Sequence, residues 1–184
     1  RHPPDGTLAG ARNEAVACAS GDWLCFLDAD DELLPGYLDA MRTACAKADA
    51  AGELYVVTRP ASRNAQWVLP LLLVPALQYA WEGAGASEPR IPDWDRLLLD
   101  VNCAVIGTLV PRPLFLAVGG FREWPVYEDW ELWLRCVRAG ARMVPVPEAV
   151  YRAHVRPGSR NTPTADAKRV YDQIRLEHRT VPAE

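Results

Sequence analysis

Apolar residues recur along the chain with two different periods, and these periods predict alternating helices and strands. Between residues 8 and 19 they return every three or four positions, and Gly21 follows, which predicts a helix that ends before that glycine. Residues 23–27 form an unbroken apolar run, as in a strand buried on both faces. Pro35 suits the first turn of a second helix, with an apolar face made of Leu38, Met41, Cys45 and Ala48.

A strand over residues 54–58 completes a helix–strand–helix–strand order with short connections, which is typical of an α/β fold. Residues 60–103 then form an irregular region interrupted by prolines, glycines and aromatic residues. After it the pattern predicts a strand over 104–110 closed by Pro111 and Pro113, a Gly119-Gly120-Phe121 turn, a helix over 128–139, short strands over 144–146 and 150–152, and a closing helix over 165–178 within the C-terminal residues 163–184.

The helix over residues 128–139 has the clearest pattern. Trp130, Trp133, Leu134 and Val137 form one apolar stripe. Asp129 stands four residues before Trp133, so we expect its carboxylate to face the protein body. On the wetter side we expect Glu128, Glu131, Arg135 and Arg138.

Composition fits one globular domain over residues 1–184, with 49% hydrophobic and 24% charged residues. The net charge is −4 and the arginines are scattered, which argues against a nucleic-acid partner. No apolar stretch in this segment approaches the roughly 20 residues of a membrane-spanning helix. The five cysteines form no CxxC pair and most have apolar neighbours like buried thiols, which indicates a reducing cytoplasm.

Three carboxylates, Asp28, Asp30 and Asp31, follow the first strand directly. Ligands of parallel α/β sheets bind beyond the carboxyl ends of the strands. Oxygen ligands of this kind suit Mg²⁺ or Mn²⁺ carried with substrate phosphates. The alternative is an acidic helix N-terminus before Pro35, where negative charge is favourable without a metal.

Asp129 also has two interpretations. Near a helix N-terminus its carboxylate can satisfy free N–H groups, which is a structural role. A partly buried carboxylate can instead serve as a general base. The helix end lowers its pKa and burial raises it, so both interpretations stay open at this point.

Three motifs give the chain a resemblance to a known family. Ala11-Arg12-Asn13 with Ser20-Gly21-Asp22-Trp23 through Asp28-Ala29-Asp30-Asp31 resembles the central signature of family 2 glycosyltransferases. Gly119-Gly120-Phe121 with Glu128-Asp129-Trp130 is similar to their acceptor-side signature, and Tyr151-Arg152-Ala153-His154 to their closing motif. The order of all three motifs is far more specific than any one of them.

The resemblance implies a GT-A fold, with a mixed and mainly parallel sheet flanked by helices. It implies that Asp30 binds Mn²⁺ or Mg²⁺, that Asp31 assists, and that Asp28 lies at the ribose or beside the metal. Asp129 would take the proton of an acceptor hydroxyl, so that the sugar is transferred with inversion. One base is enough because the metal neutralises the leaving nucleoside diphosphate, whereas a glycosidase uses two carboxyl groups.

Further contacts follow from the same resemblance. Arg12 and Asn13 are expected at the donor, although Arg12 can equally bury its stem and pair with a local acid. His154 is an additional candidate for the metal or a phosphate. The implied donor is a nucleotide-diphosphate sugar, and the acceptor is a saccharide, a lipid-linked group or another hydroxyl, bound on the side of residues 60–103. The candidate acceptor contacts are Gly120, Trp124, Glu128 and Trp130.

The chain also departs from the family pattern at its start. It opens on Arg1, before the Arg12-Asn13 motif, so we expect that the family's N-terminal nucleoside-binding strands are missing and that an exposed sheet edge favours self-association. The expected location is the cytoplasm, including the inner face of a membrane. Two other functions remain open: a non-catalytic carbohydrate- or nucleotide-sugar-binding relative, and a sugar nucleotidyltransferase, although no Gly-rich phosphate loop is visible.

Overall fold

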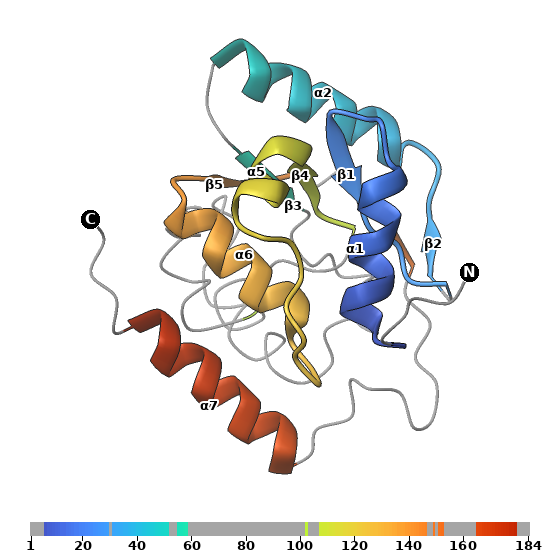
Figure 1. The fold of residues 1–184 in the computed structure, drawn as a ribbon. Coiled ribbons are helices and arrows are strands. Elements are labelled where there is room, and N and C mark those ends of the chain that lie inside the picture. Colours follow the sequence, from blue (N-terminus) through green and yellow to red (C-terminus); the bar gives the residue numbers. More distant parts are fainter. Residues whose placement is uncertain are drawn as a thin grey trace, which may run out of the picture.

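The computed structural model describes residues 6–29, 31–51, 55–58, 102, 107–146, 149, 151–152 and 165–179 (Figure 1). The described helices and strands alternate over much of the chain. In chain order they are α1 (Leu8–Cys18), β1 (Trp23–Cys25), β2 (Glu32–Leu33), α2 (Tyr37–Ala51), β3 (Tyr55–Thr58), β4 (Leu109–Pro111), α5 (Arg112–Ala117), α6 (Glu128–Arg138), β5 (Arg142–Pro145), β6 (Tyr151–Arg152) and α7 (Ala165–Arg179).

Four of the described strands form one mixed sheet in the order β1-β4-β3-β5. β4 pairs antiparallel with both β1 and β3, and β3 pairs parallel with β5. Consequently β1, β3 and β5 run in one direction and β4 in the other. The expected mixed sheet is confirmed. The sheet was expected to be mainly parallel, and three of the four described strands do run in the same direction. However, β4 is inserted between β1 and β3, so two of the three pairings are antiparallel.

Helices cover both faces of this sheet (Figure 1). Val110 of β4 belongs to the main core cluster, which α1, α5, α6 and α7 also supply. Its neighbour Leu109 points to the opposite face, into a smaller cluster built on Tyr37, Met41 and Cys45 of α2. The expected α/β class is therefore present as a sheet between two helical layers.

Several elements differ in detail from the sequence-based prediction. β1 ends at Cys25 instead of residue 27, and Cys25 is exposed. The buried face of α2 begins with Tyr37, while Leu38, expected inside, is 55% exposed. Cys18 is exposed as well, so only Cys45 and Cys136 fulfil the expectation of buried thiols among the described cysteines.

A short helix, α5, follows β4 where the prolines were expected only to close a strand. Pro111 is its N-cap residue and Pro113 lies in its first turn. Proline fits there because the first N–H groups of a helix have no partner inside the helix. The prolines therefore end a strand and begin a helix at the same point.

The charged side of α6 is buried, which corrects the expected wetter side. Glu128 and Arg135 are almost fully buried and Glu131 is completely buried, while only Arg138 is exposed as expected. The side expected to face water meets other parts of the chain instead: Glu128 pairs with Arg12 of α1, Arg135 donates to the carbonyl of Gly120, and His178 of α7 lies beside Glu131. In this structure Arg138 Nη2 donates to the backbone carbonyl of His178 at 2.8 Å, which fastens α7 to α6. None of the helices described here is long and apolar enough to cross a membrane.

Candidate active site

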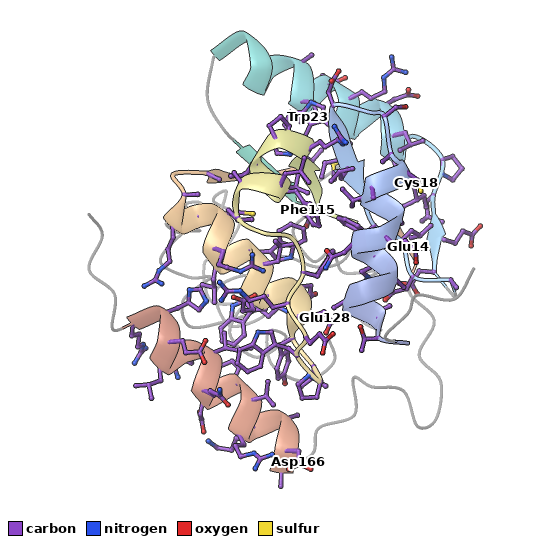
Figure 2. All side chains as sticks on the ribbon, in the orientation of Figure 1. Glu14, Cys18, Trp23, Phe115, Glu128 and Asp166 are labelled. Atoms are coloured by element: carbon purple, nitrogen blue, oxygen red, sulfur yellow. The ribbon has the colours of Figure 1, made fainter. Side chains whose placement is uncertain are left out.

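Arg12 of α1 joins two acidic residues that lie far apart in the sequence. Its Nη2 donates to Asp28 Oδ1 at 2.6 Å, just beyond β1, and its Nη1 donates to Glu128 Oε1 at 2.9 Å, at the first residue of α6. The guanidinium also lies 5.1 Å from the ring centre of Phe121. The side chains of Arg12 and Glu128 are each only 9% exposed, so this is a buried, charge-assisted contact. Figure 2 shows Glu128 at the end of α6 that faces α1.

The neighbouring Asn13 holds the glycine turn against α1. Its Oδ1 accepts from the backbone N–H of Phe121 at 2.9 Å, and its Nδ2 donates to the carbonyl of the same residue at 2.9 Å. Gly120 has φ +67°, and a Cβ added to it would lie 2.6 Å from Asn13 Oδ1. A glycine is needed at position 120 for both reasons. The Asn13 amide is thus engaged with backbone, and its contact with a donor stays a prediction.

Asp129 lies in the first turn of α6, between Glu128 and the buried Trp130. Its Oδ1 accepts from the backbone N–H of Trp130 at 2.7 Å and from Asn102 Nδ2 at 3.4 Å. Burial, with the adjacent carboxylate of Glu128, raises the pKa of Asp129 to about 6, although Trp130 N–H, Arg12 and Asn102 pull it down. The carboxylate therefore satisfies a helix N–H, as the structural interpretation expects, while its role as a general base stays a prediction.

The residue before this helix has an unusual backbone. Tyr127, the N-cap, has φ 65° and ψ 23°, and among the described residues it alone is a non-glycine with positive φ. Strained backbone of this kind often occurs at functional sites. Burial, followed by Tyr171 and Asp129, raises the pKa of Tyr127 above its ordinary value.

The acidic segment lies next to the closing motif. The backbone N–H of Asp31 bonds to the carbonyl of Asp28 at 3.0 Å, which closes a tight turn. β2 follows and pairs antiparallel with β6, with Glu32 opposite Arg152. Asp30 and His154, two of the expected metal ligands, lie outside the described residues. Within the described ranges no three His, Cys, Asp or Glu side chains are grouped as a metal site.

The expected acceptor contacts lie in and around α6. Trp130 is completely buried and stacks on Tyr171, so it presents no surface to an acceptor in this arrangement. Gly120 is buried in its turn, and Glu128 is bonded to Arg12. Trp124, only partly buried, packs against the main core at the loop before α6. Their contacts with an acceptor remain predictions, with Trp124 the most accessible of the four.

Beneath this site a second ionic cluster fixes α6 to the glycine turn. Arg135 pairs with Glu131 at 2.8 Å and donates to the carbonyls of Val118 and, at 2.6 Å, Gly120. Arg122 Nη1 lies 3.1 Å and His178 Nε2 3.6 Å from Glu131 Oε1. Burial pushes the pKa of Glu131 up, but hydrogen bonds from His178 and Arg135 and the charges of the arginines outweigh it and lower that pKa.

Sequence reasoning missed three residues around Asp129. Asn102 lies in an irregular region without a motif, so no local signal indicated its contact. Tyr127 and Tyr171 were not candidates either, since backbone strain and ring stacking between α6 and α7 depend on tertiary packing. For α7, the apolar spacing of Val170, Tyr171 and Ile174 was the one available signal of a packed face.

Comparison with known proteins relates the chain to a family. The model of the family described as glycosyl transferase family 2 matches residues 1–97, which is more than half of the 184 residues. The matched range contains Arg12, Asn13 and the acidic segment after β1, and it ends before α6. No curated protein and no solved structure matches the chain.

Proposed function

Because this chain belongs to glycosyltransferase family 2, we propose that it transfers a sugar with inversion from a nucleotide-diphosphate sugar to an acceptor hydroxyl, with Asp129 as the general base. A glycosyl-transfer role follows from the family, whose GT-A type of fold accords with the mixed sheet and its two helical layers. The base, the metal and the stereochemistry are the further steps proposed here.

The observation that carries the proposal is the environment of Asp129. A pKa of about 6 leaves its carboxylate mostly ionised near neutral pH and more basic than an ordinary aspartate. Through Glu128, Arg12 and Asp28, a continuous set of ionic contacts joins the first turn of α6 to the acidic segment after β1. A base on one side of a reacting sugar and donor ligands on the other is the arrangement that in-line displacement requires.

In the proposed reaction Asp129 accepts the proton of the acceptor hydroxyl. The acceptor oxygen forms a bond to the anomeric carbon from the face opposite the leaving group. The bond from that carbon to the diphosphate oxygen breaks, and its electron pair leaves with the nucleoside diphosphate. The products are the inverted glycoside, the nucleoside diphosphate, and a proton that passes from Asp129 to water.

The residues after β1 fit a divalent cation by their chemistry. Carboxylate oxygens are the ligands that Mg²⁺ and Mn²⁺ prefer. Asp30 would hold the ion with the help of Asp31, and His154 is the candidate from the closing motif. The pairing of Glu32 with Arg152 supports this set, because these described residues lie two positions from Asp30 and His154. When bound, the cation would neutralise charge on the diphosphate as it leaves.

We propose an indirect donor role for Arg12. Its guanidinium is occupied by Asp28 and Glu128 and is largely buried, so it orients Asp28 toward the donor and does not itself need to reach a phosphate. Asp28 keeps a side chain that is 41% exposed, which leaves it accessible to a ribose hydroxyl or to the metal shell. Trp124 is the proposed acceptor contact, because aromatic faces stack on sugar rings and its side chain is only partly buried.

Calorimetry tests whether the chain binds the nucleotide part of a sugar donor through a divalent metal. Binding of UDP, GDP and dTDP is measured with and without Mn²⁺ for the wild type, for Asp30→Ala, and for Asp172→Ala, which removes an exposed carboxylate of α7. We expect one nucleotide to bind only with Mn²⁺, and this binding to be lost in Asp30→Ala alone. If no nucleotide binds under any condition, the donor site is wrong and a non-catalytic relative becomes the better interpretation.

A further inference from the structure

The C-terminal helix α7 contacts the turn that carries Asp129. The ring of Tyr171 stacks on the ring of Trp130, with centroids 4.7 Å apart and planes inclined by 17°. The same ring meets Tyr127 edge-on at 6.1 Å, and Tyr127 meets Trp130 edge-on at 6.0 Å. The three aromatic rings come from α6, from α7 and from the residue before α6, and they pack around the first turn of α6. Tyr127 and Trp130 stand on either side of Asp129 in the sequence.

These contacts bear on the position of the Asp129 carboxylate. The backbone N–H of Trp130 donates to Asp129 Oδ1 at 2.7 Å, so a displacement of Trp130 moves the donor that orients the carboxylate. Tyr127 begins α6 with a left-handed backbone, a conformation that persists only where surrounding contacts hold it. Tyr171 touches both residues, and it does so from a helix anchored in the core by Val170 and Ile174.

We propose that Tyr171 is a positioning residue for the general base: it stacks on Trp130, braces Tyr127, and so fixes the orientation of the Asp129 carboxylate and limits the access of water to it. The inference rests on the proposed role of Asp129. It assigns to α7 a part in glycosyl transfer through the packing of the Tyr171 ring.

The charged and titratable groups that face Asp129 come from several elements. Glu128 is its neighbour on α6, Arg12 approaches from α1, Asn102 donates to it, and Tyr127 precedes the helix. Removing the Tyr171 ring deletes none of these groups, but it removes the packing that holds Trp130 and Tyr127 in position. Water can then reach the carboxylate, and the pKa of Asp129 moves down toward its ordinary value.

The test compares Tyr171→Ala with Tyr171→Phe, which keeps the ring, and with Leu176→Ala, which shortens a side chain of α7 that is 64% exposed. The Asp129 carboxyl pKa is measured by ¹³C NMR, and hydrogen exchange is measured at the Trp130 amide. Release of nucleoside diphosphate is followed with UDP-glucose, GDP-mannose and dTDP-rhamnose in the presence of Mn²⁺. Tyr171→Leu replaces the alanine variant if that variant does not fold.

We expect Tyr171→Ala to lower the Asp129 pKa by about 1 unit and to speed exchange at Trp130. With the active donor, kcat should fall by about 10- to 100-fold while the donor KM changes less than about twofold. Tyr171→Phe and Leu176→Ala should stay near the wild type in all three measurements.

A Tyr171→Ala protein that loses only thermal stability, with wild-type pKa, exchange and kcat, would overturn the positioning role. A separate variant, Asp129→Asn, tests the proposed function itself. If Asp129→Asn retains wild-type turnover, Asp129 is not the base, whatever Tyr171→Ala does to the carboxyl pKa and to exchange at Trp130.

Discussion

Arg12 Nη1 donates to Glu128 Oε1 at 2.9 Å, across 116 residues of sequence. Glu128 directly precedes Asp129, and the other terminal nitrogen of Arg12 donates to Asp28, just beyond β1. One guanidinium therefore sets the separation between the proposed base and the proposed donor site. A mutation at Arg12 should consequently affect both sites, although they belong to different motifs.

Arg12→Met tests this link, because methionine keeps an apolar stem and removes the charge. The buried Glu128 carboxylate and Asp28 lose their shared cation, which should cost about 3–5 kcal/mol of unfolding free energy. Chemical denaturation measures the loss. The matched control is Arg169→Met, whose arginine is 80% exposed and should contribute less than about 1 kcal/mol. Equal effects of the two substitutions would contradict a buried bridge at Arg12.

Adjacent glycines in the turn before α6 should respond differently to alanine. Both have positive φ, so both substitutions strain the backbone by about 1 kcal/mol. At Gly119 an added Cβ meets nothing within 4 Å, whereas at Gly120 it meets Asn13 Oδ1 at 2.6 Å and the Phe115 ring at 3.2 Å. Gly120→Ala should therefore cost about 1–3 kcal/mol more than Gly119→Ala. Thermal denaturation of the two variants measures this difference. Equal stability of the two variants would mean that Asn13 does not hold the turn through its hydrogen bonds to Phe121.

Glu131→Gln should destabilise the chain strongly, because the carboxylate is completely buried and pairs with Arg135. We expect a loss of about 3–5 kcal/mol in urea unfolding at neutral pH, against almost none for the exposed Glu177→Gln on α7. The Glu131 pKa is lowered in the folded state, so its stabilising effect is present above the unfolded pKa and is lost as the pH falls through the folded value. The difference in unfolding free energy between the wild type and Glu131→Gln should therefore become smaller in acid. A difference that does not change with pH would count against this ion pair.

Unlike the Glu131 carboxylate, the ionised Asp129 carboxylate should lower the stability of the folded chain. Its folded pKa of about 6 exceeds its unfolded value, so the folded state binds more protons between these values and stability falls as the pH rises through them. Asp129→Asn removes that cost. We expect the variant to be more stable than the wild type by about 1–3 kcal/mol at pH 8, with the difference vanishing near pH 4. Unfolding curves at several pH values measure this, and a variant that is less stable at pH 8 would refute the raised pKa.

Local periodicity was sufficient for most of the fold. The helices α1, α2, α6 and α7 and the strands β1, β3, β4, β5 and β6 all overlap predicted elements, because each carries an apolar pattern of its own. The order of the strands was not readable, since the insertion of β4 between β1 and β3 depends on contacts across the intervening residues 60–103. The strand β2 was missed because it follows the acidic segment directly, and the short helix α5 was missed because its prolines were expected to close a strand.

At Asp129 the helical spacing predicted that the carboxylate faces the protein body, whereas the direction of its pKa shift was left open because burial and the helix end act in opposite directions. Neighbouring charges were harder to place. Glu128, Glu131 and Arg135 were expected in water because charged residues are usually exposed, yet ion pairs with Arg12 and with each other make their burial stable. Whether a charged side chain is buried depends on its tertiary partners, and sequence spacing contains no information about a partner 116 residues away.

The most direct measurement is the turnover of Asp129→Asn beside its affinity for the donor nucleotide found by calorimetry. Asparagine is nearly isosteric and can still accept the Trp130 N–H bond, so loss of the base is the main change. If Asp129 is the general base, kcat falls by about 100-fold or more while nucleotide affinity with Mn²⁺ stays within about twofold. Turnover close to that of the wild type would contradict the central claim.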